Sequence, residues 1–244
     1  MLFFEKYIKR LKMKIVVTGA SRGIGFELVK QFSATASNTV FAVSRNVSKL
    51  EQLKKECVND NVICIPCDLS IPAEVDMLIA TLKQKTETID AVVNNAGTLV
   101  NKPFSEITTA DLEYVYNVNV FSVVRMIQGV LPLMNEKEKS HILNISSVGG
   151  FQGSAKFAGL SAYSSSKAAL VCLTECLAEE FKDRNIAFNC LALGAVQTEM
   201  LEEAFPGYKA PVSAKEMAVY VSDFLLNAHR VMNGRIIPVS LSTP

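Results

Sequence analysis

The stretch Lys14-Ile-Val-Val-Thr-Gly-Ala-Ser-Arg-Gly-Ile-Gly25 combines an apolar run with a glycine-rich turn. The β-branched run at 15–17 is typical of a parallel strand covered on both faces. The glycines permit positive φ angles and a close backbone approach, and apolar residues at helical spacing follow at 26–32. A strand, a glycine turn and a helix N-terminus in this order predict a site for the phosphates of a dinucleotide. A glycine-rich turn without a ligand is the alternative.

Segments with strand and helix patterns alternate through the rest of the chain. This alternation predicts an α/β, doubly wound Rossmann fold, a seven-stranded parallel sheet with helices on both faces and the order 3-2-1-4-5-6-7. The long helical region at 109–134 is expected to be interrupted or bent near Pro132. The further strands are expected at 39–43, 62–66, 89–93, 141–145, 186–192 and 235–239, and the helices after the first at 47–57, 72–86, 109–134, 162–183 and 214–227.

Residues 1–12 precede the strand pattern and form an amphipathic extension, whereas 13–244 are expected to fold as a single Rossmann-fold catalytic domain. Apolar and charged residues are interleaved in the extension, which is unlike a signal peptide and typical of one apolar helical stripe. An upstream leader is one interpretation. A short helix docked on the domain, on a subunit or on a membrane surface is the other, and docking on protein is the expectation.

Composition excludes several classes of protein. The 25 basic and 24 acidic residues nearly cancel, so no nucleic-acid partner is expected, and no apolar run approaches the length of a membrane span. Six cysteines lie mostly in apolar runs, as free thiols do in a reducing cytosol, which predicts a cytoplasmic protein. Cys64 and Cys67 close a strand, so redox or metal chemistry is not expected there. His141 and His229 lack ligand-like neighbours, and no metal site is predicted.

A phenol and an ammonium lie four positions apart, at Tyr163 and Lys167, just past the fifth strand, where ligands of open α/β sheets bind. A nearby cation lowers a phenol pKa by about 1 to 3 units, so Tyr163 could exchange a proton with a carbonyl or alcohol oxygen. Ser147, at the mouth of that strand, could orient the oxygen, or it could serve a turn or cap. Asn119, a mediocre helix former inside a helix, could hold a water that links Lys167 to solvent, or it could be a satisfied buried amide.

Together these residues resemble the short-chain dehydrogenases/reductases, nicotinamide-dependent single-domain oxidoreductases, over nearly the whole chain from Lys14 to about Val239. The resemblance implies that Tyr163 is the proton donor in reduction and that Ser147 positions the substrate oxygen. It also implies that Lys167 lowers the phenol pKa and binds the nicotinamide ribose, and that Asn119 completes a proton relay. Hydride would pass between the nicotinamide and the carbonyl carbon.

The charges around the second strand favour NADP(H) over NAD(H). NAD-binding sites generally place an acid at the end of this strand, whereas this chain has Ser44 and Arg45. Arg22 in the glycine turn adds a second guanidinium, and two such groups suit a 2′-phosphate. From the resemblance and the charges together, the cofactor contacts are expected at Gly19, Ser21, Arg22, Gly23, Ile24, Gly25, Arg45, Asp68, Leu69, Asn95, Ala96, Gly97, Tyr163, Lys167, Val196 and Thr198.

Two features depart from the family pattern. Leu193-Gly194 stands where the family usually has Pro-Gly, which bears on the contacts expected from Val196 and Thr198. Ser147 and Tyr163 are sixteen positions apart, a few more than usual, so 150–161 is expected to form a rim of the active site. Residues 199–212 are expected to form a short lid over an apolar substrate.

The leading hypothesis is an NADPH-dependent reductase of ketones or aldehydes that acts on a small-molecule carbonyl or the matching alcohol. A 3-oxoacyl-carrier-protein reductase is an alternative, and so is a sensor or scaffold that binds NADP(H) without catalysis. Helices at 109–134 and 162–183 carry apolar residues on more than one face, for example at 171–173 and Leu177. A homodimer or homotetramer is therefore expected, with deeper packing inside one subunit as the alternative.

Overall fold

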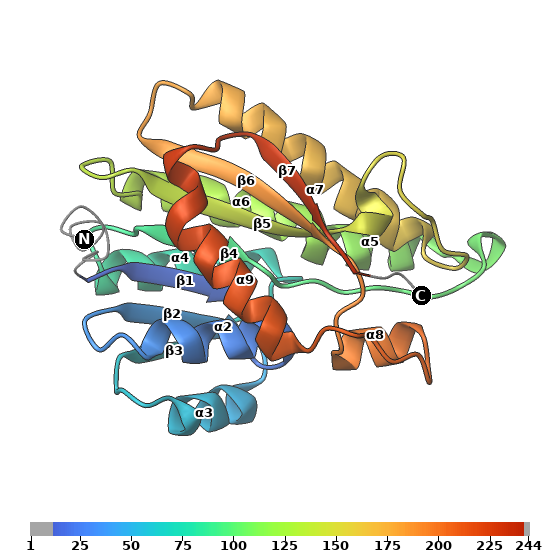
Figure 1. Cartoon of the computed structure of the whole chain (residues 1–244), viewed down its shortest axis with the longest axis horizontal. Helices are drawn as coiled ribbons and strands as arrows, with labels where there is room; N and C mark the ends of the chain where they lie inside the picture. The colour runs from blue at the N-terminus through green and yellow to red at the C-terminus, as the bar shows by residue number, and fades with distance from the viewer. Residues whose placement is uncertain (1–11, 242–244) are drawn as a thin grey trace.

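The computed structural model describes residues 12–241, and these build one sheet in the order β3-β2-β1-β4-β5-β6-β7 (Figure 1). Every pair of neighbouring strands is parallel. The predicted fold class and strand order are therefore confirmed. The strands are β1 (Lys14–Thr18), β2 (Thr39–Ser44), β3 (Val62–Pro66), β4 (Ala91–Asn94), β5 (Ser140–Ser147), β6 (Ile186–Leu193) and β7 (Arg235–Val239).

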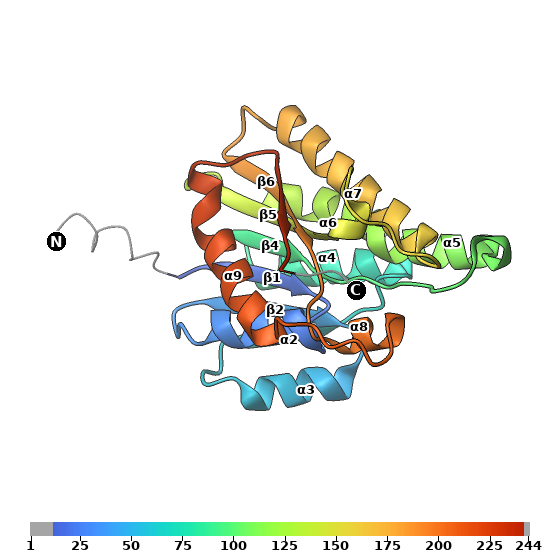
Figure 2. The same ribbon diagram turned by 45° about the vertical axis from the view of Figure 1, so that its right-hand side comes forward.

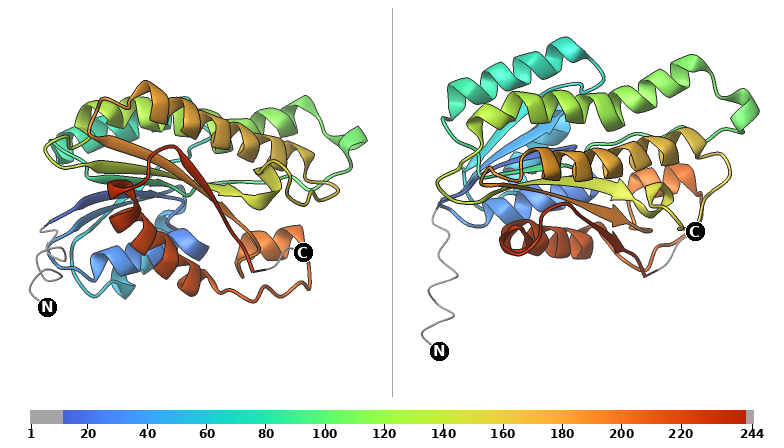
Figure 3. Two further views of the ribbon diagram at one scale, coloured as in Figure 1. Left: turned by 45° about the horizontal axis from the view of Figure 1, so that its top comes forward. Right: turned by 90° about the horizontal axis from the view of Figure 1, so that it is seen from above.

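Helices cover both faces of the sheet, as the view from above shows (Figure 3). One face carries α2 (Gly23–Ser33), α3 (Val47–Glu56) and α9 (Ala214–Asn227). The other carries α4 (Pro72–Lys85), α6 (Ser122–Val130) and α7 (Ser161–Glu180). Because the strands are sandwiched between two helical layers, their side chains are apolar on both faces, and all eight residues of β6 are buried.

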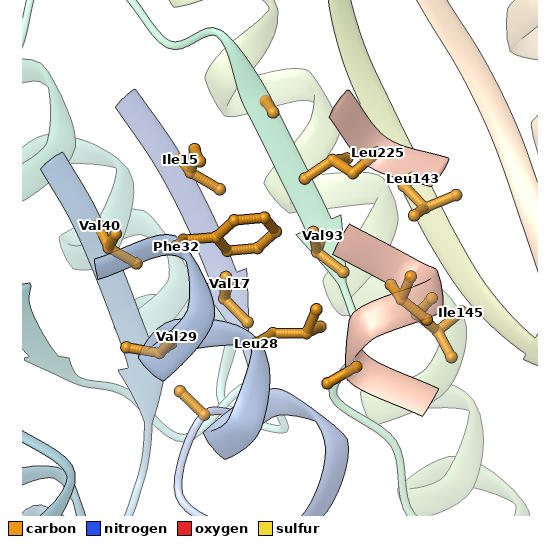
Figure 4. Close-up of a cluster of buried hydrophobic side chains, with 14 of the residues drawn as sticks. Ile15, Val17, Leu28, Val29, Phe32, Val40, Val93, Leu143, Ile145 and Leu225 are labelled. Atoms are coloured by element: carbon orange, nitrogen blue, oxygen red, sulfur yellow. The ribbon is translucent and has the colours of Figure 1, made fainter. Parts of the chain in front are cut away.

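Alternate residues of β1 supply the two cores. Ile15 and Val17 point to the face of α2 and pack with Leu28 and Phe32 of that helix (Figure 4). Val16 points to the opposite face and joins the cluster of α4 and α6. The period of two along the strand thus fixes which side chains anchor each helical layer.

The long helix expected at 109–134 is divided into four pieces. They are α5 (Thr109–Tyr116), the π-helical η2 (Asn117–Phe121), α6, and the 3₁₀ turn η3 (Leu131–Leu133). Pro132 lies in η3, so the helix does end near the expected proline. The π-helical segment that carries Asn119 was not expected, and such segments are frequently found at functional sites.

The carboxyl ends of the strands form the edge that bears the short elements. Figure 2 shows α8 (Glu199–Ala204) beyond these ends, apart from the helices that cover the sheet. The 3₁₀ turn η4 (Val148–Gly150) follows β5 directly, while η1 (Phe104–Glu106) and η5 (Ala228–Arg230) lie in other connections. In 12–241, none of the helices has the length and apolarity that a membrane crossing requires. The extension expected at 1–12 falls, apart from Lys12, outside the described residues.

Candidate active site

A cleft of about 700 Å³ opens at the carboxyl ends of the strands, where the sequence predicted the site. Two of the predicted residues, Gly25 and Asn119, lie behind its wall. All the others line it: Gly19, Ser21, Arg22, Gly23, Ile24, Arg45, Asp68, Leu69, Asn95, Ala96, Gly97, Ser147, Tyr163, Lys167, Val196 and Thr198.

The glycine turn between β1 and α2 is shaped for close backbone approach. Gly19 and Gly23 have φ angles of +69° and +56°, which disfavour other residues. A Cβ on Gly25 would lie 2.3 Å from the carbonyl oxygen of Gly19, so this glycine lets α2 press against the turn. Among the described residues no side chain caps the start of α2, and its first turn has no acid. Its N–H groups and the positive end of its dipole are therefore suited to an anion.

Asn95, just after β4, ties that strand to the glycine turn. Its side-chain amide donates to the carbonyl oxygens of Thr18 at 3.0 Å and Gly19 at 3.3 Å. The hydroxyl of Thr18 in turn accepts from the backbone N–H groups of Asn95 and Ala96, each at 3.1 Å. The two walls of the cleft are thereby held together at its floor.

Lys167 is held at the floor of the cleft by the backbone of β5. Its Nζ donates to the carbonyl oxygen of Ile145 at 2.9 Å, and it lies 6.0 Å from the centre of the Tyr163 ring. A Cβ on Gly97 would come within 3.3 Å of this Nζ, so the glycine makes room for the ammonium. Ser146 donates to the carbonyl oxygen of Lys167 at 2.8 Å and fixes α7 against β5.

Burial shifts the pKa of both candidate catalytic groups in the direction that favours the uncharged form. It lowers the pKa of Lys167 to about 8 and raises the pKa of Tyr163, against which a hydrogen bond with Ser147 acts in the lowering direction. The net shift of the Tyr163 pKa is upward because the phenol is removed from water, and the Lys167 ammonium is directed to the carbonyl oxygen of Ile145. The expectation that Lys167 lowers the phenol pKa stays a prediction.

Asn119 lies at the centre of the π-helical segment and is fully buried. Its side-chain oxygen accepts from the backbone N–H of Thr98 at 2.8 Å, and its amide donates to the carbonyl oxygen of Thr98 at 2.9 Å and to Ser166 Oγ at 2.9 Å. This geometry matches the satisfied buried amide that the sequence left open. It also fixes the loop after β4, which carries Gly97, against α7.

Two guanidinium groups border the part of the cleft where the sequence predicts the 2′-phosphate. Arg45 lies 3.7 Å from Asp68 Oδ2, and a hydrogen bond with Tyr114 raises the pKa of Arg45. Burial acts to raise the pKa of Asp68, but hydrogen bonds from Ser70 and the charge of Arg45 give it a net lowering. Arg22 forms an ion pair of 2.7 Å with Glu203 of α8.

The predicted rim and lid meet above the cleft. Phe157 of the rim packs edge-on against Phe205, which follows α8, with ring centres 5.5 Å apart. The side chain of Asn101 donates to the carbonyl oxygen of Ala204 at 2.9 Å, so the loop after β4 also holds this end of α8. Leu99, Leu160, Met200 and Leu201 add apolar surface to the same part of the cleft.

Leu193, which replaces the usual proline, continues β6 and pairs with Val239. The N–H of Gly194 then donates to the carbonyl oxygen of Val239 at 2.8 Å. The chain turns back after this bond, and both Val196 and Thr198 reach the cleft. Thr198 caps α8 by accepting from the N–H of Leu201 at 3.3 Å. Leu193 is therefore compatible with both residues lining the cleft.

The sequence reasoning missed three residues that line the cleft, Phe157, Tyr114 and Glu203, and also Asn101, which holds the end of α8. Phe157 falls in the predicted rim, and its aromatic ring was a usable signal. The others resemble ordinary surface residues, and their partners are distant in the chain; Glu203 follows Arg22 by 181 positions. No local pattern marks such a pair.

The described residues contain no group of three or more histidine, cysteine or acidic side chains placed to hold a metal ion. Burial raises the pKa of the Cys67 thiol to about 12, which makes it a poor nucleophile at neutral pH.

Comparison with known proteins gives one family match, two similar reductases and one similar solved structure. The model of the short chain dehydrogenase family matches residues 13–209. A fatty acyl-CoA reductase of Acinetobacter baylyi is 30% identical over 84% of this chain and 71% of its own length, and a fatty acyl-CoA reductase of Mycobacterium tuberculosis is 29% identical over 92% and 76%. Among solved structures, the RhlG/NADP complex of Pseudomonas aeruginosa superimposes with a TM-score of 0.83 at 28% identity, over 96% of this chain and 97% of that one.

Proposed function

The chain belongs to the short-chain dehydrogenase/reductase family of oxidoreductases, and on this premise we propose that it reduces a ketone or aldehyde with NADPH, or oxidises the matching alcohol with NADP⁺. One observation carries the proposal. Ser147, Tyr163 and Lys167 line the same cleft as the glycine turn between β1 and α2. A nucleotide on the turn and a carbonyl beside the phenol would therefore share one enclosed space.

Tyr163 acts as the acid in reduction. Its raised pKa keeps the phenol protonated at neutral pH, so the proton is available for the carbonyl oxygen. The hydroxyl of Ser147 interacts with the same phenol and orients the substrate oxygen. When bound, NADPH supplies the hydride that the carbonyl carbon receives. Lys167 holds the ribose, and Asn119 supports the loop that carries Gly97 beside the Lys167 ammonium.

The residues present fit an NADP(H) molecule. The uncapped start of α2 offers N–H groups for the pyrophosphate, and Asp68 and Leu69 line the cleft where the adenine is expected. Arg22 and Arg45 supply the positive charge that a 2′-phosphate requires. The similar solved structure from Pseudomonas aeruginosa is an NADP complex, which supports this choice of cofactor.

The substrate carries an apolar chain next to its carbonyl group. Phe157, Leu160, Met200, Leu201 and Phe205 give the outer cleft an apolar surface. Such a surface excludes water and stabilises alkyl groups by about 25 cal/mol for each Å² buried. Two relatives that are named fatty acyl-CoA reductases support this class of substrate.

A panel of ketones and aldehydes with short and long alkyl chains tests the proposal. We expect the purified protein to oxidise NADPH with long-chain carbonyls faster than with short-chain ones, and faster than it oxidises NADH. Tight NADPH binding without turnover on the whole panel would favour the sensor or scaffold. Turnover of an added 3-oxoacyl-carrier-protein but of no member of the panel would favour a 3-oxoacyl-carrier-protein reductase.

A further inference from the structure

We propose that Glu203 lowers the preference for NADP(H) by competing with its 2′-phosphate for Arg22. The inference rests on the proposed function, because it assumes that the nucleotide occupies the cleft. Glu203 belongs to α8, within the lid expected over the substrate, and takes no part in the chemistry. Its contact with Arg22 connects this lid to the glycine turn that would hold the cofactor.

The geometry joins the lid to the glycine turn at two points. Arg22 Nη1 donates to Glu203 Oε1 at 2.7 Å, across the mouth of the cleft. One turn of α8 earlier, a Cβ on Gly23 would lie 3.2 Å from the methyl group of Thr198. The start of α8 therefore rests on the turn, and Glu203 bridges the remaining gap. Both ion-pair partners line the cleft, so a ligand in the cleft can reach the contact.

A 2′-phosphate and the Glu203 carboxylate would both bind the guanidinium of Arg22. A phosphate monoester carries about −1.5 to −2 charges and offers three acceptor oxygens, whereas the carboxylate carries one charge and uses one contact. The phosphate should therefore displace the carboxylate. NAD(H) has a hydroxyl group at this position and would leave the ion pair intact.

The ion pair of Arg22 and Glu203 is weak enough for a phosphate to replace the carboxylate. The Arg22 and Glu203 side chains are 39% and 58% exposed, so solvent screens their attraction. The interaction energy of exposed ion pairs of this kind corresponds to about a two- to fivefold change in a binding constant. We therefore expect Glu203 to weaken NADPH binding by about that factor and to leave NADH binding unchanged.

The test measures the Kd of NADPH and of NADH by fluorescence titration for the wild-type protein and for Glu203→Gln. The control is Glu202→Gln, which removes the same charge one position away; Glu202 accepts from the backbone N–H of Gly207 rather than from Arg22. Glu203→Gln is also made in the Arg22→Gln protein. We expect about two- to fivefold tighter NADPH binding in Glu203→Gln alone, with no change for NADH, in the control, or in the Arg22→Gln background.

The outcomes separate this inference from the proposed function. If NADPH binds and Glu203→Gln changes nothing, or if both lid variants tighten both nucleotides equally, the competition is refuted while the proposed function stands. If the wild-type protein does not prefer NADPH but Glu203→Gln does, the competition is supported and Glu203 is the residue that masks the preference. If neither nucleotide binds to any variant, the proposed function is wrong and the competition is refuted with it.

Discussion

At the scale of single residues, the burial of the Lys167 ammonium lowers the stability of the folded protein. Its side chain is 4% exposed, with one hydrogen bond from Nζ to the carbonyl oxygen of Ile145. Burial of a charged ammonium is unfavourable, and the pKa of Lys167 falls to about 8 as a result. Residues that serve chemistry commonly reduce stability in this way.

The pH dependence of stability tests this environment. The folded protein releases the Lys167 proton near pH 8 and the unfolded chain only near 10.5. Between these values the unfolded state binds more protons, so this group makes the protein more stable as pH rises, by up to about 3 kcal/mol. Lys167→Met removes the contribution. We expect its free energy of unfolding in urea, relative to wild type, to fall between pH 7 and pH 10.

The comparison with Lys167→Met is needed because two buried thiols change the stability in the opposite direction as pH rises. Burial raises the pKa of the Cys67 and Cys190 thiols to about 12, so these groups make the folded state less stable above the pKa of an exposed thiol. They are present in both proteins and largely cancel in the difference. A difference that stays constant from pH 7 to pH 10 would contradict the assignment of a strongly lowered pKa to Lys167.

At the scale of elements, the π-helical segment Asn117–Phe121 is the feature that local patterns could not predict. The sequence indicated one helix there and a bend at Pro132, because proline has a known effect on helices and the residues at 117–121 have none. The extra residue in the π turn is stabilised by contacts with the loop after β4, which is distant in the chain. Asn119 was nevertheless found from the sequence, since asparagine is unusual inside a helix.

Asn119→Ala tests whether this side chain holds the loop in place. The change removes the hydrogen bonds to the N–H and carbonyl groups of Thr98 and the one donated to the hydroxyl of Ser166, which keeps its own bond to the carbonyl oxygen of Tyr163. We expect the free energy of unfolding, measured by urea denaturation, to fall by about 2 to 3 kcal/mol. Asn117→Ala is the matched control, because Asn117 lies in the same segment and makes no side-chain hydrogen bond within the described chain. A loss of equal size in both variants would contradict the assignment.

At the scale of the whole molecule, the sheet was predictable because each strand is a short apolar run bounded by turn residues. The glycine turn after β1 and the handedness of crossovers then left one strand order. Contacts between distant segments were not predictable, and the Arg22–Glu203 pair and the junction of rim and lid are of this kind. The cytoplasmic location and the single-domain organisation of 13–244 stay predictions.

Association into dimers or tetramers also stays a prediction. Leu173 and Leu177 pack against the core of their own subunit, which explains part of the apolar surface that suggested it. Phe104 in η1 is 80% exposed, however, Phe121 in the π-helical segment is 46% exposed, and Cys172 is exposed on α7. We expect light scattering to give two or four times the chain mass of 26.7 kDa. A molar mass of one chain would show that these surfaces are left to solvent.

The most direct measurement is single-turnover reduction of a carbonyl substrate by preformed protein–NADPH complex, for wild type and for Tyr163→Phe. The substitution removes the phenolic proton and retains the ring. We predict that NADPH binds to both proteins with similar affinity and that the rate of NADPH oxidation falls by about 10²- to 10⁴-fold in the variant. An unchanged rate in Tyr163→Phe would show that the proton comes from another group, and the catalytic role of this cleft would have to be reassigned.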